Sequence, residues 1–367
     1  MSYLLFKLAF DAPVHFGPSD SALSLYTSED FFRADTLFSA LCHTAGDELD
    51  RLVKSVQNDC LRFSDAMPWR GDTLFLPKPC FSAESASDIS PELRKKVKKL
   101  KWIPVSAMNA FTASLRGEET FIPQDDDRFG RLVERTRAAV SDSEDAVPYQ
   151  VGAFRFDENC GLWFIAECRE EDASWLEHLV TMLGYSGIGG KTSSGFGAFH
   201  LDDLVYLDAP FDDETEWLSS ALHTDADRYL LLTSCLPAES ELDAVIPSAS
   251  FQLVRRGGFV QSDSYAAAPQ KKQTQYFLSS GAVVGKRFSG GLFDVGQHGN
   301  HPFIAIRGRS FWGWIYDTQR APRRIQRPAD DPRAAFHRQR KELCQKGIRL
   351  SLSEGHPLPA GQGPAAG

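Results

Sequence analysis

Residues 184–197 read GYSGIGGKTSSGFG, and a chain with so much glycine in one place has few ways to continue a regular element through it. The segment before it, residues 171–183, has apolar side chains at helical spacing, and residues 197–207 have the character of a strand. The sequence therefore predicts a helix, a glycine loop and a strand, in that order. A turn between a helix and a strand needs fewer glycines, so we expect another backbone or a ligand to approach this loop closely.

One nucleotide-binding motif and one hydrolase motif can be excluded at this loop. A P-loop requires G-x-x-x-x-G-K-[ST] between a strand and a following helix. The Gly190-Lys191-Thr192 end is present, but Tyr185 stands where the first glycine belongs, and the order of the elements is reversed. The nucleophile-elbow pattern G-x-S-x-G also fails, because Ile188 occupies its last position. Neither an NTPase nor an α/β-hydrolase is indicated.

The composition is that of a globular protein large enough for two domains. The chain has 367 residues, of which 42% are hydrophobic and 11% aromatic. It shows neither a long apolar run nor a signal-peptide pattern, so we expect a cytoplasmic protein without contact to a membrane. Seven scattered cysteines without a C-x-x-C pair predict reduced thiols. No cofactor is expected, and no metal, since His298 and His301 lack further ligands at suitable spacing.

Charge is unevenly distributed along the chain. The formal net charge is −9, yet basic residues gather in short clusters, which is compatible with binding a polyanion through local surfaces. These clusters are residues 94–101, 255–256, 271–272, 286–287 and 320–340. For residues 94–101, contact with RNA and a merely solvated face remain equally open. The acids Asp125, Asp126 and Asp127 are interpreted as a solvated loop rather than a magnesium site.

The order of the expected elements predicts an α+β fold. The expected elements come in a fixed order along the chain. They are a strand at residues 3–10, a helix with Asp35 as its N-cap, a strand at 73–76, a hairpin of 151–156 with 161–168, and the helix and strand around the glycine loop. This is the βαββαβ order of a ferredoxin-like, or RRM-like, unit. We expect this first unit to span residues 1–207, with an irregular polar insertion at about 107–148.

The remainder of the chain is expected to hold a second ferredoxin-like unit. An acidic linker at residues 208–227 precedes it, and the unit itself covers 228–316. Gly257-Gly258 predicts a hairpin between residues 251–256 and 259–262. Residues 317–367 are rich in Arg and Pro and predict a flexible basic tail, to which we assign no function.

The chemistry of the glycine loop suits a chain of phosphates. Backbone N–H groups together with Lys191, Thr192, Ser193 and Ser194 could hold an RNA backbone without recognising bases. A tight turn without a ligand is the alternative.

At this point the motifs resemble a known family. The form GIGGKxSSGFG, residues 187–197, is similar to the signature of the RAMP proteins of CRISPR systems. PVHFG at 13–17 and FRADTLFSAL at 32–41 resemble the subunit of type III-A (Csm) effector complexes that caps the 5′ end of the guide RNA. Residues 255–259 and 301–311 are also similar, and the resemblance covers about residues 1–312. A neighbouring type III subtype is not separated by these motifs.

The resemblance implies a non-catalytic, RNA-binding subunit of a ribonucleoprotein in antiviral defence. Such a subunit anchors the repeat-derived 5′ tag of the CRISPR RNA (crRNA), between the large polymerase/cyclase-like subunit and the adjacent backbone RAMP subunit. The positions that would contact RNA are Gly187, Gly189, Gly190, Lys191, Thr192, Ser193, Ser194, Gly195, Gly197, His15, Arg33, Arg255 and Arg256.

An enzymatic alternative rests on a single histidine. Some RAMP relatives cut RNA without a metal, using a histidine to deprotonate a 2′-hydroxyl. His15 could be that general base in a nuclease that processes CRISPR repeat RNA, although no partner acid accompanies it in the sequence. We favour RNA contact or a structural role for His15.

Overall fold

A computed structural model gives the structure of the chain. It describes residues 1–18, 24–80, 91–123, 128–141, 144–259, 271–294, 304–307 and 312–316. The chain divides into two compact units, Met1–Ile325 and Gln326–Gly367. The second unit, the tail expected from residue 317 onwards and the acids at 125–127 lie outside the described residues. The following description concerns the first unit.

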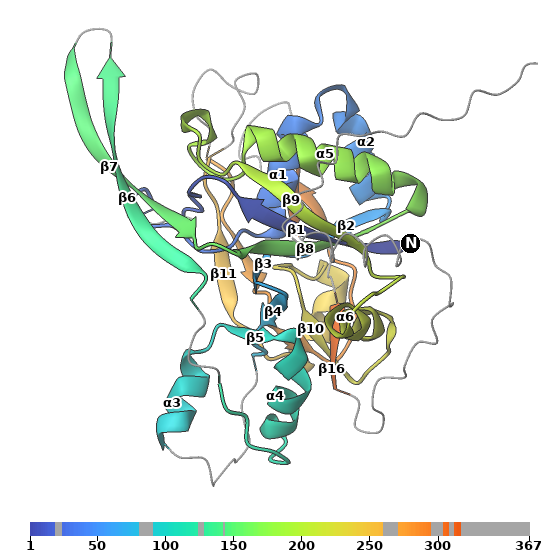
Figure 1. Ribbon diagram of the computed structural model, residues 1–367. Coiled ribbons are helices and arrows are strands. Elements are labelled where there is room, and N and C mark those ends of the chain that lie inside the picture. The colour runs from blue at the N-terminus through green and yellow to red at the C-terminus, as the bar shows by residue number, and fades with distance from the viewer. Residues whose placement is uncertain are drawn as a thin grey trace, which may run out of the picture. The chain divides into compact units, whose positions relative to one another are not determined.

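A seven-stranded antiparallel sheet forms the centre of this unit (Figure 1). Its order is β5-β4-β3-β8-β1-β9, and β2 pairs with β8 beside β3. The strands are β1 (Ser2–Phe10), β2 (Leu61–Phe63), β3 (Met67–Arg70), β4 (Thr73–Pro77), β5 (Trp102–Pro104), β8 (Cys160–Cys168) and β9 (Phe199–Tyr206). In the middle of the sheet, Phe6 of β1 is opposite Phe164 of β8, and their rings stack with centroids 4.9 Å apart. The core therefore lies along the two central strands.

Helices cover the sheet through their apolar stripes. In Figure 1, α1, α2 and α5 lie together on one side of it, and α1 contacts both α2 and α5. On α5, Leu176, Leu179, Val180 and Leu183 are buried at helical spacing. The helices are α1 (Ala34–Thr44), α2 (Leu49–Gln57), α3 (Pro91–Lys99), α4 (Met108–Leu115), α5 (Ala173–Ser186), α6 (Asp213–His223) and α7 (Leu242–Val245). Short 3₁₀ turns are Gly46–Glu48, Val105–Ala107, Glu170–Asp172, Thr192–Ser194, Glu239–Glu241 and Ile246–Ser248.

The acidic segment 208–227, expected as a linker, contains a helix. Helix α6 begins after Asp212. The Asp212 carboxylate accepts a hydrogen bond from the N–H of Thr215 at 2.8 Å, and the Thr215 hydroxyl oxygen accepts one from the N–H of Asp212 at 3.2 Å. This reciprocal capping box satisfies N–H groups that the first turn leaves without an acceptor. The acids that suggested a linker therefore begin a helix.

The C-terminal part of the described chain builds small sheets around a second core. β10 (Arg228–Leu231) lies between β13 (Val283–Val284) and β16 (Trp312–Tyr316). Two further pairs are β11 (Leu253–Arg256) with β12 (Gln275–Leu278), and β14 (Gly291–Asp294) with β15 (Ile304–Arg307). Tyr229, Leu231, Val245, Leu278 and Val284 are among the buried residues of this core. In the described portion of residues 228–316 the only α-helix is the four-residue α7, where a βαββαβ order needs two.

The predicted mixed α+β class is confirmed, and so are the strand at 3–10 and the helix and strand that flank the glycine loop. The predicted hairpin of 151–156 with 161–168 is wrong. β7 (Glu144–Phe156) pairs with β6 (Gly130–Ser141), whereas β8 pairs with β1, β2 and β3. Almost every residue of β8 is buried. A strand buried on both faces belongs at the centre of a sheet, so its partners come from distant parts of the chain.

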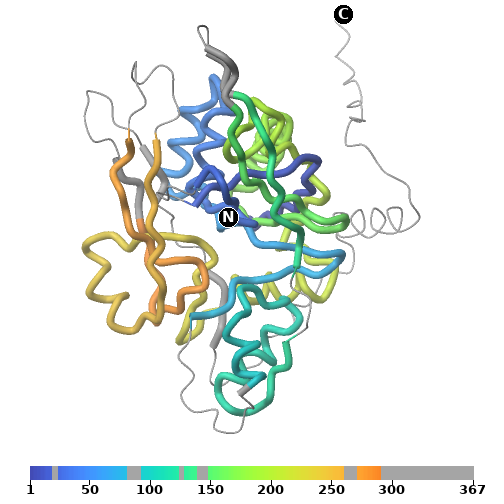
Figure 2. Tube along the Cα trace, turned by 90° about the vertical axis from the view of Figure 1, so that its left-hand side faces the viewer, coloured from blue at the N-terminus to red at the C-terminus, as the bar shows by residue number. Residues whose placement is uncertain are grey.

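The expectation that residues 107–148 are irregular is also wrong. Helix α4 buries Met108 and Phe111, and β6 forms a long ribbon with β7 (Figure 2). The polarity of this region misled the interpretation because a two-stranded ribbon can expose charged residues along its length and still satisfy its backbone hydrogen bonds. Arg131, Glu134 and Arg135 are such exposed positions of β6.

The predicted N-cap of α1 and the predicted partner of β11 are both wrong, because each depends on residues that are distant in the sequence. Asp35 is not the N-cap of α1; the cap position is Arg33, and the N–H of Ala34 donates instead to the carboxylate of Asp65 at 2.9 Å. The partner of β11 is β12 rather than residues 259–262. Phe259 forms an isolated bridge with Lys271, and residues 260–270 lie outside the described part of the chain.

Candidate nucleic-acid interface

The base of the glycine loop is closed by the protein itself. Helix α5 ends where Gly187 donates its N–H to the carbonyl of Leu183 at 2.8 Å. Gly197 accepts from Ile188 at 3.0 Å and donates to the carbonyl of Pro13 at 2.9 Å. These hydrogen bonds use backbone groups that the sequence interpretation had assigned to a ligand.

The glycines of the base are required by close approach of the protein's own segments. A Cβ atom added to Gly197 would lie 2.1 Å from the carbonyl oxygen of Ile188. A Cβ on Gly190 would lie 2.7 Å from His15 Cδ2, and the N–H of Gly190 donates to the His15 carbonyl at 2.8 Å. Gly187 and Gly189 are similarly crowded, by Phe196 and by His15 with Phe16. The glycine content predicted that another backbone or a ligand approaches this loop closely. Residues 13–16 are that backbone.

The tip of the loop is different, because it faces solvent. Lys191, Ser193, Ser194 and Gly195 are exposed, and Thr192 is half-buried. Lys191 has a left-handed backbone with φ 64° and precedes the 3₁₀ turn Thr192–Ser194. The N–H groups of Lys191, Thr192 and Ser193 donate to no acceptor in the described part of the chain. Successive N–H groups in such a left-handed-to-right-handed turn form a concavity that suits anions.

The β6–β7 hairpin adds a cation and an aromatic ring to this tip. Arg137 donates to the carbonyl of Ser194 at 3.1 Å, and its guanidinium carbon is 5.2 Å from the centroid of the Phe196 ring. On the facing strand, Tyr149 is opposite Arg137, and the Lys191 ammonium lies 5.4 Å from its ring centroid. Figure 1 shows the hairpin projecting beyond the sheet. The exposed loop tip is thus bordered by two cations and a phenol ring.

The sequence interpretation missed Arg137 and Tyr149. Arg137 lies about fifty residues before the loop, in the region interpreted as irregular, and Tyr149 about forty residues before it, just after that region. The signal that could have found them is the alternation of Arg131, Arg135 and Arg137 at a period of two, which is typical of one face of a strand.

His15 lies beneath the loop rather than on its surface. Its side chain is 8% exposed, and Nδ1 is 2.6 Å from the carbonyl oxygen of Gly152 in β7. Because a carbonyl can only accept, Nδ1 carries the proton of this hydrogen bond. Val14 pairs with Phe154 in the same strand through two hydrogen bonds of 2.8 Å. Residues 13–16 therefore connect the glycine loop to the hairpin.

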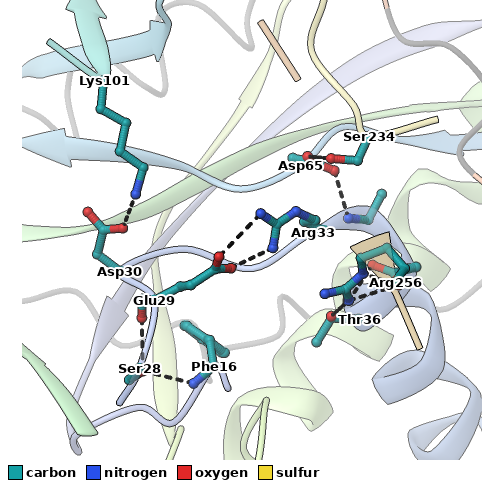
Figure 3. A network of polar contacts seen from close by, with 12 residues as sticks. Phe16, Ser28, Glu29, Asp30, Arg33, Thr36, Asp65, Lys101, Ser234 and Arg256 are labelled. Carbon is teal, nitrogen blue, oxygen red and sulfur yellow. Dashed lines mark hydrogen bonds and ion pairs between the residues drawn. The ribbon is translucent and has the colours of Figure 1, made fainter. Parts of the chain in front are cut away.

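Arg33 is an interior residue. It is 9% exposed, and its Nη1 is 2.5 Å from a carboxylate oxygen of Glu29 (Figure 3). Its guanidinium lies over the ring of Phe31. Burial alone would lower the pKa of Arg33, but the hydrogen bond and charge of Glu29 outweigh it and raise that pKa. The cation is thus neutralised inside the fold.

Arg256 joins the C-terminal part of the unit to α1. Its Nε and Nη2 each lie 2.9 Å from an oxygen of the Asp35 carboxylate, and Nη2 also donates to the Thr36 hydroxyl at 3.0 Å (Figure 3). This bidentate geometry is the strong form of an Arg–carboxylate pair. Its neighbour Arg255 is exposed and stands opposite Tyr276 of β12. Of the predicted positions, the loop tip and Arg255 therefore reach the surface, whereas His15, Arg33 and Arg256 hold the structure.

Asp65 is a buried carboxylate that the sequence did not suggest. One oxygen accepts the N–H of Ala34 at 2.9 Å, and the other accepts the hydroxyl of Ser234 at 2.6 Å (Figure 3). Its own N–H donates to the carbonyl of Leu232 at 2.9 Å. Burial raises the pKa of Asp65, although the Arg33 charge and the two hydrogen bonds oppose the rise. Asp65 fixes the start of α1 to residues 232–234.

Among the residues that the structure describes, no group of three or more His, Cys, Asp or Glu side chains is arranged to hold a metal ion. None of the helices within those ranges is both long and apolar enough to cross a membrane.

Comparison with known proteins identifies the class. Residues 7–200, which contain most of the sheet and the glycine loop, match the model of the RAMP superfamily. Residues 224–314 match the model described as the CRISPR Csm4 C-terminal domain. "CRISPR system Cms protein Csm4" of Mycobacterium tuberculosis is 35% identical over 311 residues, which cover 82% of this chain and 94% of that protein. The chain belongs to the Csm4 family, and the resemblance noted in its sequence is confirmed.

Further relatives and solved structures agree. The Csm4 protein of Streptococcus thermophilus is 29% identical over 80% of this chain and 93% of its own length. A chain in the "Csm3-Csm4 subcomplex in the type III-A CRISPR-Cas interference complex" has a TM-score of 0.56 at 15% identity, covering 86% of this chain and all of that one. A chain of the "Csm1-Csm4 cassette in complex with pppApA" has a TM-score of 0.53 at 18% identity, with 90% and 100% covered. At these identities the structures show a shared fold.

Proposed function

We propose that the chain is a non-catalytic RNA-binding subunit of a type III-A CRISPR effector complex, in which it anchors the repeat-derived 5′ tag of the crRNA. Membership of the Csm4 family supports this role. Similar solved structures contain Csm4 with Csm3 in a type III-A interference complex and Csm4 with Csm1 in a cassette. By analogy, this subunit joins the large polymerase/cyclase-like subunit to the adjacent backbone RAMP subunit.

The observation that carries the proposal is the composition of the loop tip. The N–H groups of residues 191–193 have no acceptor among the described residues, and the same loop tip carries the Lys191 side chain and accepts a hydrogen bond from the Arg137 guanidinium at Ser194. Backbone donors and cations bind phosphate oxygens without reading a base. The Tyr149 ring beside them offers a surface on which a base of a single strand can stack. The tip therefore suits a short stretch of single-stranded RNA held in a fixed register.

The enzymatic alternative fits the geometry less well. A nuclease with His15 as general base needs an imidazole that reaches a 2′-hydroxyl in the bound RNA. The His15 ring is almost fully buried, and Nδ1 is occupied by Gly152. A structural role for His15 beneath the glycine loop accounts for both its burial and its hydrogen bond to Gly152.

We also propose two ferredoxin-like units for this chain. The order β9-β1-β8-β2, with α1 before β2 and α5 before β9, supports a ferredoxin-like βαββαβ unit for residues 1–207. For residues 228–316 we propose a reduced RRM-like unit built on β13-β10-β16. Residues 201–223 fall between the two matched family models, which supports a boundary near α6.

A cross-linking experiment tests the function. The chain is assembled with its partner subunits and a crRNA that carries a photoreactive nucleotide in the 5′ tag, and cross-linked peptides are identified by mass spectrometry. We expect peptides that contain Lys191 or Tyr149. If tag nucleotides cross-link only to other subunits, the proposed anchor is wrong.

A further inference from the structure

Helix α3 carries the densest positive charge of the described chain. Residues 94–101 contain six Lys and Arg residues and no acid, in a protein whose formal net charge is −9. The acid of the helix is Glu92, in its first turn. A proposal for this charge does not depend on the glycine loop, because α3 leads into β5 at one edge of the sheet and the loop leads into β9 at the other (Figure 1).

The charge is sorted onto one face of the helix. Val97 and Leu100 are half-buried and pack against the main core. At about 100° per residue, Lys95, Lys98 and Lys99 project from the opposite side and Arg94 lies at its border, and all four are exposed. They extend over about 7.5 Å of the axis at about 1.5 Å per residue. The outer face is therefore a short basic strip.

Remote residues fix this strip in place. The Lys78 ammonium donates to the carbonyls of Val97 and Lys98 at 3.1 and 2.9 Å, which satisfies the C-terminal end of the helix. The N–H of Lys78 also donates to the carbonyl of Lys101 at 2.9 Å, and the Lys101 side chain pairs with Asp30 at 2.5 Å. Lys95, Lys98 and Lys99 make no ion pair with any of the described residues. The helix is thus anchored to the fold and presents cations that no acid among the described residues neutralises.

The like charges on the outer face of α3 lower the stability of the helix unless a polyanion is bound there. Arg94 with Lys98, and Lys95 with Lys99, are like charges four residues apart, and each such pair destabilises a helix by about 0.2–0.5 kcal/mol. Nucleic acid is a better fit than an acidic protein, because lysine is depleted in protein–protein interfaces but binds phosphate as a point charge. The strip has no aromatic residue, so it offers charge without base stacking.

We propose that the outer face of α3 binds the phosphate backbone of nucleic acid without regard to sequence, as a second surface separate from the glycine loop. Such a surface lets one subunit hold two segments of nucleic acid at opposite edges of its sheet.

The test uses the full chain and a labelled 20-nucleotide uridine RNA, with affinity measured by fluorescence anisotropy over a range of salt concentrations. The variant combines Lys95→Gln, Lys98→Gln and Lys99→Gln, because Gln and Lys have similar helix propensities. A control combines Lys54→Gln, Arg169→Gln and Lys286→Gln, exposed positions elsewhere with the same total change of charge. We expect the α3 variant to bind about tenfold more weakly at low salt, with a salt slope shallower by about 2, and the control to lose less than about twofold.

Two results would overturn the proposal. One is equal binding of RNA by the α3 variant and the control variant. The other is unchanged RNA binding by an α3 variant that no longer assembles with the partner subunits, which would assign the strip to an acidic protein. A Lys191→Ala variant measured in parallel separates this surface from the loop, since distant independent sites have additive effects.

Discussion

Gly190 donates its N–H to the carbonyl of His15 at 2.8 Å, and the His15 ring, whose Cδ2 would lie 2.7 Å from an added Cβ, leaves no room for a side chain at position 190. The glycine loop is therefore a composite of two parts with different purposes. Its base packs on residues 13–16, and its tip, Lys191 to Gly195, extends to solvent. This division leads to separate expectations for substitutions in each part.

Gly190→Ala tests the packing of the base. The added Cβ would lie 2.7 Å from His15 Cδ2, and overpacking of this kind costs about 1–3 kcal/mol. We expect a lower thermal midpoint and weaker RNA binding. Gly71→Ala is the control outside the loop, because a Cβ there meets no atom within 4 Å and only its φ of 57° is unfavourable. Equal destabilisation by both substitutions would contradict the packing argument.

His15→Ala separates structure from catalysis. Loss of the Nδ1 hydrogen bond to Gly152 should destabilise the fold by about 1–3 kcal/mol, since the buried carbonyl is left without a donor. No cleavage of repeat RNA is expected from the unaltered chain in EDTA, as measured on a denaturing gel. His200→Ala, at a histidine that is 59% exposed, is the control. A defined cleavage product that disappears only in His15→Ala would restore the nuclease alternative.

Asp65 makes stability depend on pH in a predictable direction. Burial raises the pKa of Asp65 above its ordinary 3.8, so the folded state binds the proton more tightly than the unfolded chain. The contribution of Asp65 to stability is therefore highest below about pH 3.8 and falls as pH rises through the folded pKa. Asp65→Asn keeps an acceptor for Ala34 and removes this dependence.

Urea unfolding of the Asp65→Asn variant and the unaltered chain at several pH values measures the effect. The free energy of unfolding of the unaltered chain, relative to the variant, should decrease from pH 4 upwards. A relative stability that increases with pH would show that the charged carboxylate is the favoured form. Asp65→Ala should cost about 2–4 kcal/mol, since Ala34 and Ser234 both lose a buried partner.

Arg256 is expected to act on stability, and Arg255 on binding. Removing Arg256 leaves the Asp35 carboxylate partly buried without its bidentate partner, which should cost about 2 kcal/mol. A double-mutant cycle of Asp35→Ala and Arg256→Ala should give a coupling energy of about 1–3 kcal/mol. Exposed Arg255→Ala should leave the unfolding midpoint unchanged. Additive effects of the two Ala substitutions in the cycle would contradict a direct pair.

The sequence was informative where the determinants are local. The helical spacing of Leu176, Leu179 and Leu183 predicts α5, and the motif at 187–197 indicates the family. It was uninformative where distant segments meet. The Asp65 cap on α1, the contact of Arg137 with Ser194 and the pairing of Arg256 with Asp35 join residues that are 31, 57 and 221 positions apart. Such contacts leave no periodic signal, so residues expected at an RNA surface proved to be internal supports.

The measurement closest to the central claim is the salt dependence of RNA binding by a Lys191→Ala, Arg137→Ala double variant. The RNA is a crRNA fragment that carries the 5′ tag, and a Lys54→Ala, Arg169→Ala variant controls for the change in charge. Loss of two phosphate contacts on a single strand should make the slope of log K against log salt shallower by about 1.4. We expect that change together with weaker binding in the loop variant and neither in the control. Identical slopes and affinities in both variants would show that the loop tip does not hold the RNA backbone.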